Sequence, residues 1–204
     1  MAFVTLTSCN WLMSGYNATR SNNNAFDTTI TAANVHTMTR RWQVPSPWPF
    51  SPQPLVAGDT VYLFDGHIDL ATNPPWANAG VQARAADTGA LRWSTPLPIA
   101  ADASPSPAGL AFAGPNLLAA FGNTVVALDP TSGSTRWATT VDGSSAGVPI
   151  VVGDVVYVGH QGLDVSTGAV HWTAADPFAG VLAAEGGLIY FSASPKSGCI
   201  DQPI

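Results

Sequence analysis

Three segments of this sequence align without gaps on a tryptophan. They read ARAADTGALRW (Ala83–Trp93), ALDPTSGSTRW (Ala127–Trp137) and GLDVSTGAVHW (Gly162–Trp172). Each begins with Ala or Gly, has Gly at its seventh position and ends with Trp, and the second and third copies have Asp at the third position. Repetition of a supersecondary unit constrains the whole architecture, because such units bury their apolar surface by stacking on one another.

A second shared element precedes these segments. It consists of a small or apolar residue, Gly, a turn residue and an apolar run. Its four copies are LVAGDTVYLF (Leu55–Phe64), the weaker AFAGPNLLAAF (Ala111–Phe121), VVGDVVYVG (Val151–Gly159) and AEGGLIYFS (Ala184–Ser192). Gly-Asp and Asp-x-x-Thr-Gly sequences between apolar runs are typical of tight hairpins, so each complete unit predicts four antiparallel strands. The intervals from Trp42 through Trp93 and Trp137 to Trp172 are 51, 44 and 35 residues, close to the roughly 40–50 residues of propeller blades.

The composition agrees with a chain of short strands. The 204 residues include 19 Gly and 17 Pro, which lie between short apolar runs and favour many turns over long helices. A hydrophobic content of 46% is enough to bury a core. No apolar run approaches the roughly 20 residues of a membrane-spanning helix. A net charge of -6 repels phosphate backbones, so nucleic-acid binding is not expected.

The repeated tryptophan suits a position between neighbouring blades, because it offers a large apolar face and one N–H donor for a backbone carbonyl. The pattern Ala-x-Asp-x-x-x-Gly-x-x-x-Trp of Ala127–Trp137 resembles the tryptophan-docking motif of the pyrroloquinoline-quinone-like (PQQ-like) β-propeller repeat family. The stretch from Trp11 to Val44 is similar to the entry segment of its secreted members, which include quinoprotein dehydrogenases. The resemblance implies an all-β propeller of four-stranded antiparallel blades and is specific for fold rather than activity.

The predicted ring is incomplete. Family members that close a ring use seven or eight blades, whereas this sequence has three complete units and a partial fourth. We expect a fragment of a longer chain, with self-assembly of two partial rings as the alternative. Tyr190 and Phe191 are then expected on a strand without outer partners, which is an edge open to pairing. Thr39–Val44 is expected to be a strand, with Trp42 lacking its partner blade.

The N-terminus carries a candidate modification site. Leu6-Thr7-Ser8-Cys9 resembles the lipobox in which bacterial lipoproteins are acylated on Cys. The basic segment and longer apolar run of a signal peptide are missing, so residues 1–10 are interpreted as a leader or lipobox remnant. Residues 11–204 then form a single partial propeller domain. A lipid anchor on Cys9, a free thiol and a disulfide with Cys199 all remain open.

The unrepeated residues are where we expect a ligand site. The insertion DGHIDLATNPPWANAG (Asp65–Gly80) lengthens the loop between the middle strands of the first unit, and propellers carry function on such loops. His67, Asp69, Asn73 and Trp76 bring polar and aromatic groups together there and are candidates for contact with a partner or a sugar. The alternative is a loop that packs Trp76 on its own blade.

The repeated and isolated acidic residues have structural interpretations. A quinoprotein dehydrogenase would need carboxylate and amide ligands for Ca²⁺ and a catalytic Asp beside the quinone. The one Glu, Glu185, falls on a predicted hairpin turn, and Asp59 and Asp154 occupy equivalent turns where Asx-type bonding is expected. The four His lack metal-site spacing, and His171 is predicted to face solvent. We therefore assign no catalytic, cofactor-binding or metal-binding residue.

Two functions follow from these observations. The first is a non-catalytic, extracytoplasmic, bacterial-type propeller that acts as a binding or scaffold module. Its protein partner is expected at the propeller face or the open edge. The alternative is a fragment of a PQQ-dependent quinoprotein alcohol dehydrogenase whose active-site residues lie outside this chain, and only then are PQQ and Ca²⁺ expected as cofactors.

Overall fold

The fold is built almost entirely from β-strands. The computed structural model describes residues 10–25, 28–44, 52–65, 79–98, 107–143, 146–175, 180–192 and 198–201. These residues contain the strands β1 to β15 and one short 3-10 helix, η1 (Val35–Thr37). The prediction of an all-β chain is confirmed.

The strands form four antiparallel sheets in chain order. Sheets 1, 2 and 3 have four strands each, and sheet 4 has three. Sheet 1 contains β1 (Leu55–Ala57), β2 (Thr60–Asp65), β3 (Gly80–Ala85) and β4 (Leu91–Pro96). Sheet 2 contains β5 (Pro107–Ala113), β6 (Asn116–Phe121), β7 (Thr124–Leu128) and β8 (Thr135–Thr140). Sheet 3 contains β9 (Ile150–Val152), β10 (Val155–Val158), β11 (Gln161–Asp164) and β12 (Val170–Thr173). Sheet 4 contains β13 (Gly180–Glu185), β14 (Leu188–Ser192) and β15 (Gly198–Asp201).

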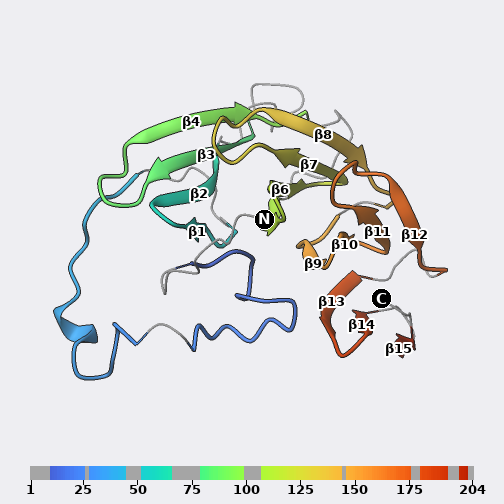
Figure 1. Ribbon diagram of the computed structural model, residues 1–204, viewed down its shortest axis with the longest axis horizontal. Helices are drawn as coiled ribbons and strands as arrows, with labels where there is room; N and C mark the ends of the chain where they lie inside the picture. Colours follow the sequence, from blue (N-terminus) through green and yellow to red (C-terminus); the bar gives the residue numbers. More distant parts are fainter. Residues whose placement is uncertain are drawn as a thin grey trace, which may run out of the picture.

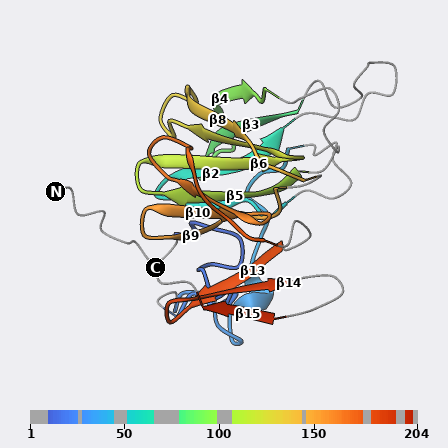
Figure 2. The same cartoon turned by 90° about the vertical axis from the view of Figure 1, so that its right-hand side faces the viewer.

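The sheets are arranged as an open arc (Figure 1). β4, β8 and β12 lie along its outer side, and β1, β5 and β9 lie toward its centre. In Figure 2 the tight hairpins that join β5 to β6 and β9 to β10 lie at the same end of the molecule. Three complete blades and a partial fourth, as predicted, are therefore present in the described residues.

Apolar side chains fill the space between neighbouring sheets. One buried cluster joins sheets 1 and 2 and includes Leu55, Val81 and Leu117. A second joins sheets 2 and 3, and a third joins sheets 3 and 4. The outer strand β8 alternates exposed side chains with Trp137, whereas the middle strands β6 and β7 are buried on both faces. Burial on both faces explains why β6 and β7 are continuous apolar runs, since each sheet is covered by its two neighbours.

Residues 10–25 run along the inner edges of the sheets. Trp11 forms a β-bridge with Val56 of β1, and Leu12 accepts a hydrogen bond of 2.7 Å from the backbone N–H of Phe112 in β5. Farther along, Ala18 accepts a hydrogen bond of 3.0 Å from the N–H of Ala184 in β13. The entry segment therefore ties the first, second and fourth sheets together from inside the arc (Figure 1).

Each outer-strand tryptophan of sheets 1 and 2 contacts the next sheet. The Trp93 Nε1–H donates to the Pro130 carbonyl at 2.9 Å, and the Trp137 Nε1–H donates to the Val165 carbonyl at 3.0 Å. A β-carbon added to Gly168 would lie 2.5 Å from the Trp137 ring, and one added to Gly133 would lie 2.6 Å from the Trp93 ring. The indoles thus lie against hairpin glycines of the following sheet, and the expected hydrogen bond to a backbone carbonyl is present.

Three expectations about the ends of the arc were wrong. Thr39–Val44 is not a strand, because these residues make no strand pairing in the described part of the chain. Trp42 does have a partner: its Nε1–H donates to the Ala86 carbonyl at 2.9 Å, and its ring lies against Gly89 in the hairpin between β3 and β4. The strand carrying Tyr190 also has an outer partner, because β15 pairs with β14 and places Cys199 opposite Tyr190. SASPKSGCID contains no repeated hairpin sequence, so β15 was not identified from the sequence.

Candidate functional site

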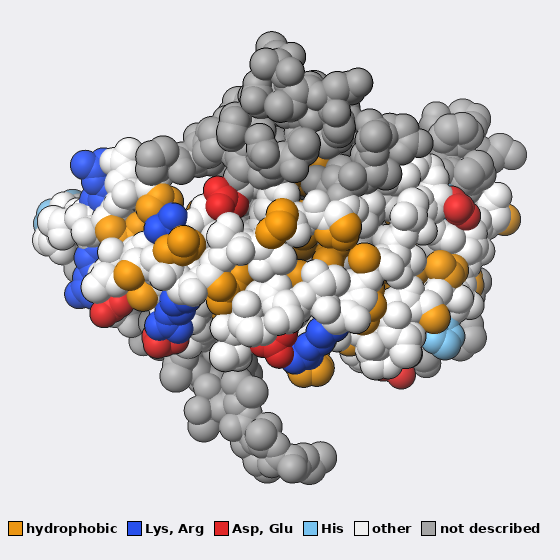
Figure 3. All heavy atoms as spheres, turned by 90° about the horizontal axis from the view of Figure 1, so that it is seen from above, with side chains coloured by type: hydrophobic (Ala, Val, Ile, Leu, Met, Phe, Trp, Pro, Cys, Tyr) orange, Lys and Arg blue, Asp and Glu red, His pale blue; other side chains and the backbone are white. Residues whose placement is uncertain are grey.

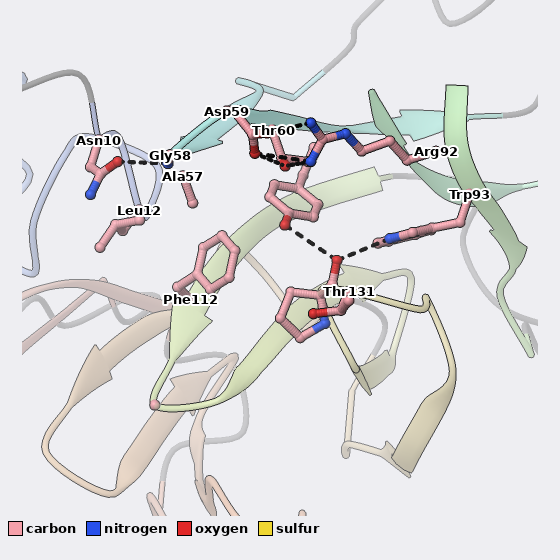
Figure 4. A pocket seen from close by; sticks show the side chains of 13 residues that line it. Asn10, Leu12, Ala57, Gly58, Asp59, Thr60, Arg92, Trp93, Phe112 and Thr131 are labelled. Atoms are coloured by element: carbon pink, nitrogen blue, oxygen red, sulfur yellow. Dashed lines mark hydrogen bonds and ion pairs between the residues drawn. The ribbon is translucent and has the colours of Figure 1, made fainter. Parts of the chain in front are cut away.

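A pocket with a volume of about 680 Å³ lies between sheets 1 and 2 (Figure 4). It opens beside the hairpins that join β1 to β2, β5 to β6 and β7 to β8, with part of its wall supplied by the entry segment. The lining residues are Asn10, Leu12, Ala57, Gly58, Asp59, Thr60, Tyr62, Arg92, Trp93, Phe112, Gly114, Pro130 and Thr131.

Three aromatic rings form one wall of this pocket. Tyr62 and Phe112 are packed edge to face with ring centroids 5.2 Å apart, and Tyr62 and Trp93 are 6.0 Å apart. The Tyr62 hydroxyl donates to the Pro130 carbonyl at 3.2 Å, which also accepts the Trp93 indole N–H. Both polar atoms of the wall are therefore satisfied within the protein, and the rings offer a ligand mainly apolar contact.

Asp59 and Arg92 form an ion pair at the pocket. The Arg92 guanidinium donates to the two Asp59 carboxylate oxygens at 2.9 and 2.6 Å and also to the Thr60 hydroxyl at 2.6 Å. The hydrogen bond from Arg92 lowers the pKa of Asp59 to about 2. Asx-type bonding had been expected for Asp59, but its principal partner is Arg92 from β4 rather than its own turn. The pair gives the pocket a polar region without net charge.

The two hairpin aspartates of the repeated segment form the expected turns. The Asp129 carboxylate accepts the backbone N–H groups of Thr131 and Ser132 at 2.8 and 3.0 Å. The Ser132 N–H, followed by the Arg136 guanidinium, lowers the pKa of Asp129 to about 2. Hydrogen bonds from Ser166 and then Thr167 lower the pKa of Asp164 as well. These carboxylates therefore hold hairpins in shape and are not free to act as acids or bases.

The pocket offers a ligand both apolar and polar contacts. Aromatic faces, a neutral ion pair and a few hydroxyl and amide groups can accept an apolar side chain that carries a polar group. Among the residues that the structure describes, no three His, Cys, Asp or Glu side chains are grouped so that they could hold a metal ion.

All five predicted site residues lie outside the described part of the chain. These are Cys9 and the loop residues His67, Asp69, Asn73 and Trp76. The loop begins after Asp65, which pairs with Gly80 at the end of β2 and β3 away from the Thr60–Ala85 pair. Since Thr60 lines the pocket, Asp65 and Gly80 lie at the opposite end of sheet 1 from the pocket.

The other singled-out polar residues have the surface positions that were expected. Glu185 is exposed at the turn between β13 and β14, where it pairs with Leu188. His171 on β12 has a 61% exposed side chain, and its Nε2 lies 3.6 Å from the Asp164 carboxylate. Both positions agree with structural interpretations of these residues.

The pocket was not predicted from the sequence. Its walls come from five segments of the chain, and none of these segments carries a motif typical of a ligand site. Tyr62 and Phe112 look like ordinary strand residues, and only the structure brings Phe112 of sheet 2 against Tyr62 of sheet 1. One signal was available. Arg92 and Arg136 directly precede the repeated tryptophans of two segments, and an Arg that recurs at this position indicates an ion pair with a hairpin aspartate.

The surface carries no large field of one sign in the view of Figure 3. Several Arg side chains lie beside acidic side chains there, as in the ion pairs Arg92–Asp59 and Arg136–Asp129. Within the described ranges, no helix has the length and apolar character needed to cross a membrane.

Comparisons with solved structures find the same fold in proteins of different kinds. A europium-containing methanol dehydrogenase matches with a TM-score of 0.61 and 19% identity, over 83% of this chain and 32% of that chain. The quinohemoprotein alcohol dehydrogenase ADHIIG from Pseudomonas putida HK5 matches with a TM-score of 0.62 and 16% identity, over 81% of this chain and 26% of that one. The computationally designed Ika4 protein matches with a TM-score of 0.60 and 12% identity, over 82% of this chain and 99% of the designed one.

The chain thus spans a third or less of the length of these two dehydrogenases, and none of the curated proteins matches its sequence. A family model described as outer membrane protein assembly factor BamB matches residues 77–191, which is more than half of the chain. That match covers the three repeated tryptophan segments and the strands that carry them. The chain therefore belongs to the PQQ-like β-propeller repeat family.

Proposed function

We propose that this chain is a non-catalytic, extracytoplasmic β-propeller module that binds another protein. The observation that carries the proposal is that polar groups of the repeated segments already form hydrogen bonds within the chain. Asp129, Asp164 and the indole N–H groups of Trp93 and Trp137 all bond within the chain, which leaves none of them for chemistry. The family model is named for an assembly factor, which supports a role in protein association.

In this proposal the repeated segment is the tryptophan-docking motif of the family, and its role is mechanical. The indoles of Trp93 and Trp137 hold the hairpins of the following sheets, so the pocket between sheets 1 and 2 keeps its shape without a ligand. A preformed pocket lowers the entropy lost on binding. We assign residues 11–204 to a single propeller domain of this type, and residues 1–10 to a leader remnant.

The pocket is the proposed contact for the partner. Tyr62, Trp93 and Phe112 would receive an apolar or aromatic side chain, and Arg92 and Asp59 would stay paired beside it. Buried aromatic contacts of this kind commonly dominate the energy of protein interfaces. The loop residues His67, Asp69, Asn73 and Trp76 are proposed as a second contact at the opposite end of sheet 1.

The proposed location is outside the bacterial cytoplasm. Cys9 follows a lipobox-like sequence, so a lipid anchor at this position would hold the propeller at a membrane surface. Mass spectrometry of the protein expressed with its own N-terminus in a Gram-negative host would test the anchor. A mass increase that is lost in Cys9→Ser supports acylation, and an unmodified Cys9 contradicts it.

Site-specific photo-crosslinking tests the binding role. A benzophenone amino acid replaces Thr131, which lines the pocket, or Val170 on the exposed face of β12 as the matched control. In a bacterial cell-envelope extract we expect a discrete protein adduct from position 131 that Phe112→Ala weakens, and none from position 170. Equal labelling from both positions would show that the pocket does not select a partner.

The alternative is a segment of a quinone-dependent alcohol dehydrogenase, and the fold shared with a methanol dehydrogenase and a quinohemoprotein alcohol dehydrogenase favours it. Incubation with PQQ and Ca²⁺ followed by gel filtration separates the two functions. The binding module is expected to elute without quinone absorbance and to reduce no electron-acceptor dye in the presence of alcohols. Retained quinone with alcohol-dependent dye reduction would establish the enzyme and exclude our proposal.

A further inference from the structure

The space between sheets 1 and 2 differs from the space between sheets 2 and 3. Between sheets 2 and 3, the buried Asn116 side chain donates to the Val165 carbonyl at 2.7 Å beside the Trp137 indole. Between sheets 1 and 2, the Tyr62 hydroxyl makes the corresponding bond to the Pro130 carbonyl. Both hairpins are therefore docked by an indole and a second donor, so docking does not require the open pocket.

The space between sheets 1 and 2 also leaves aromatic surface open. Trp137 is only 9% exposed, whereas Trp93 is half-buried and lines the pocket together with Tyr62 and Phe112. Phe112 stands at the position that Val151 occupies in sheet 3, when the two hairpins are aligned on their glycines. Figure 4 shows Trp93 and Phe112 on opposite sides of one open space. The rings therefore offer a ligand apolar surface that the docked hairpin does not cover.

The backbone beside the pocket is already paired. Trp11 and Val56 exchange two backbone hydrogen bonds of 2.8 and 3.0 Å, and the Phe112 N–H donates to the Leu12 carbonyl at 2.7 Å. These residues of β1 and β5 are thus bonded to the entry segment, which blocks strand addition next to the pocket. A partner is therefore recognised here by a side chain that enters the pocket.

The hairpins at this end of the molecule are acidic. Counted from the last residue of one strand to the first of the next, the tight hairpins of sheets 1 to 3 contain no Lys or Arg. They contain the acidic residues Asp59, Asp87, Asp129, Asp154 and Asp164. The hairpins of sheets 2 and 3 lie at one end of the molecule in Figure 2, so their carboxylates share that end.

The carboxylates nearest the pocket are available to a partner. The side chain of Asp59 is 82% exposed and that of its partner Arg92 is 39% exposed, so the ion pair turns its carboxylate toward solvent. Asp87 interacts electrostatically with Arg92. Asp87 and Asp154 are exposed, and neither forms an ion pair with a residue that the structure describes. Negative charge therefore exceeds positive charge on the turns around the pocket.

We propose that the pocket receives a large apolar or aromatic side chain from a basic segment of the partner protein. This inference rests on the binding function proposed above and names the chemistry of the partner. The inserted side chain packs on Tyr62, Trp93 and Phe112, and Lys or Arg residues beside it lie over the carboxylates of the turns. The buried anchor supplies most of the affinity. The charges at the rim speed association and select the partner.

Three synthetic peptides of equal length test the proposal on the full chain. The first has Trp between Lys residues, the second has Ala between the same Lys residues, and the third has Trp between Glu residues. Each carries the same fluorescent label, and fluorescence anisotropy measures its binding. We expect the Lys–Trp peptide to bind at least about tenfold more tightly than the Lys–Ala peptide, which lacks the anchor. It should bind at least about threefold more tightly than the Glu–Trp peptide, and added salt should reduce this difference.

Variants of the chain locate the bound peptide. Phe112→Ala removes part of the aromatic wall and should weaken the Lys–Trp peptide at least about threefold. Asp87→Lys reverses a charge at the rim and should also weaken it. Asp142→Lys is the matched control, because Asp142 follows the end of β8 that lies away from its hairpin, and it should leave the affinity unchanged. Tighter binding of the Glu–Trp peptide, or equal affinities for the unmodified chain and Phe112→Ala, would overturn the proposal.

The photo-crosslink from position 131 separates this inference from the binding function on which it rests. A basic partner predicts that the adduct weakens in Asp87→Lys and at high salt. An adduct of equal yield with and without Asp87→Lys, at low and at high salt, would keep the binding function and overturn the basic partner. Selective binding of the Lys–Trp peptide without any adduct from the envelope extract would support the chemistry of the pocket and count against a protein partner in the envelope.

Discussion

Replacement of Trp137 by alanine tests whether the repeated indole holds neighbouring sheets together. Trp137 is 9% exposed and belongs to the buried cluster between sheets 2 and 3. Its ring lies against Gly168, and its Nε1–H donates to the Val165 carbonyl at 3.0 Å. Alanine removes the ring and leaves that carbonyl without its donor.

The expected loss follows from these two contributions. Truncation of a buried tryptophan to alanine costs about 3–5 kcal/mol, including the cavity that remains. Loss of the indole hydrogen bond accounts for about 0.5–1.5 kcal/mol of this total. Trp137→Phe, which keeps an aromatic ring without the N–H, should therefore lose much less stability than Trp137→Ala.

Urea unfolding followed by far-ultraviolet circular dichroism and by tryptophan fluorescence measures the change. Coincident transitions from the two probes justify a two-state treatment, which a repeat protein does not guarantee. Trp172→Ala is the matched control, because the half-buried Trp172 packs on Tyr157 and Phe191 without a described hairpin to dock on. The expected loss of unfolding free energy for Trp137→Ala is at least ~3 kcal/mol. A loss below about 1 kcal/mol, or one no greater than that of Trp172→Ala, would refute the reasoning.

Three further predictions concern an ion pair, a hairpin turn and the pocket. The pKa of Asp59 is held near 2 by Arg92, so Arg92→Met should raise it toward the ordinary value near 4, as read from carboxyl carbon shifts in an NMR pH titration. The pKa of Asp59 is lower in the folded state than in the unfolded state. The stabilisation from this pair is therefore present above the unfolded-state pKa and is lost as the pH falls toward 2. An unchanged Asp59 pKa in Arg92→Met would contradict the assignment. Asp164→Ala should destabilise the hairpin between β11 and β12 and speed amide exchange at Ser166 and Thr167, whose N–H groups it accepts, whereas Asp154→Ala at an exposed turn should not. Phe112→Ala should enlarge the pocket and weaken adduct formation at position 131 while the far-ultraviolet spectrum stays unchanged.

The fold could be predicted from the sequence because the residues that specify each hairpin lie close together in the chain and recur in three segments. Gly and Asp at fixed positions determine hairpins through backbone conformation, and Gly133 and Gly168 have φ values of 75° and 73°, where a side chain is disfavoured. Three copies of one pattern then identify the unit and its strand order. Trp137 could be placed between sheets for the same reason, since a large apolar residue recurring at the end of each unit needs a recurring partner.

The ends of the arc and the pocket could not be predicted because they depend on contacts between distant segments. Trp42 lies 44 residues before the Ala86 carbonyl that it reaches, and no local pattern specifies that pairing. β15 follows a stretch without turn or repeat signals. The pocket exists because Phe112, Pro130 and the entry residue Asn10 converge on sheet 1 from three separate segments. Such convergence is a property of the assembled sheets rather than of any one stretch of sequence.

The central claim is that the repeated Asp, Gly and Trp residues hold the sheets together, and a pair of glycine substitutions tests it most directly. Gly168 and Gly153 both have positive φ, at 73° and 61°, so alanine costs about 1–2 kcal/mol of backbone strain at either position. A β-carbon at Gly153 meets nothing within 4 Å, whereas one at Gly168 lies 2.5 Å from the Trp137 ring. We predict that Gly168→Ala loses a further ~1–3 kcal/mol of unfolding free energy from this collision. Equal losses for the two variants would contradict the account.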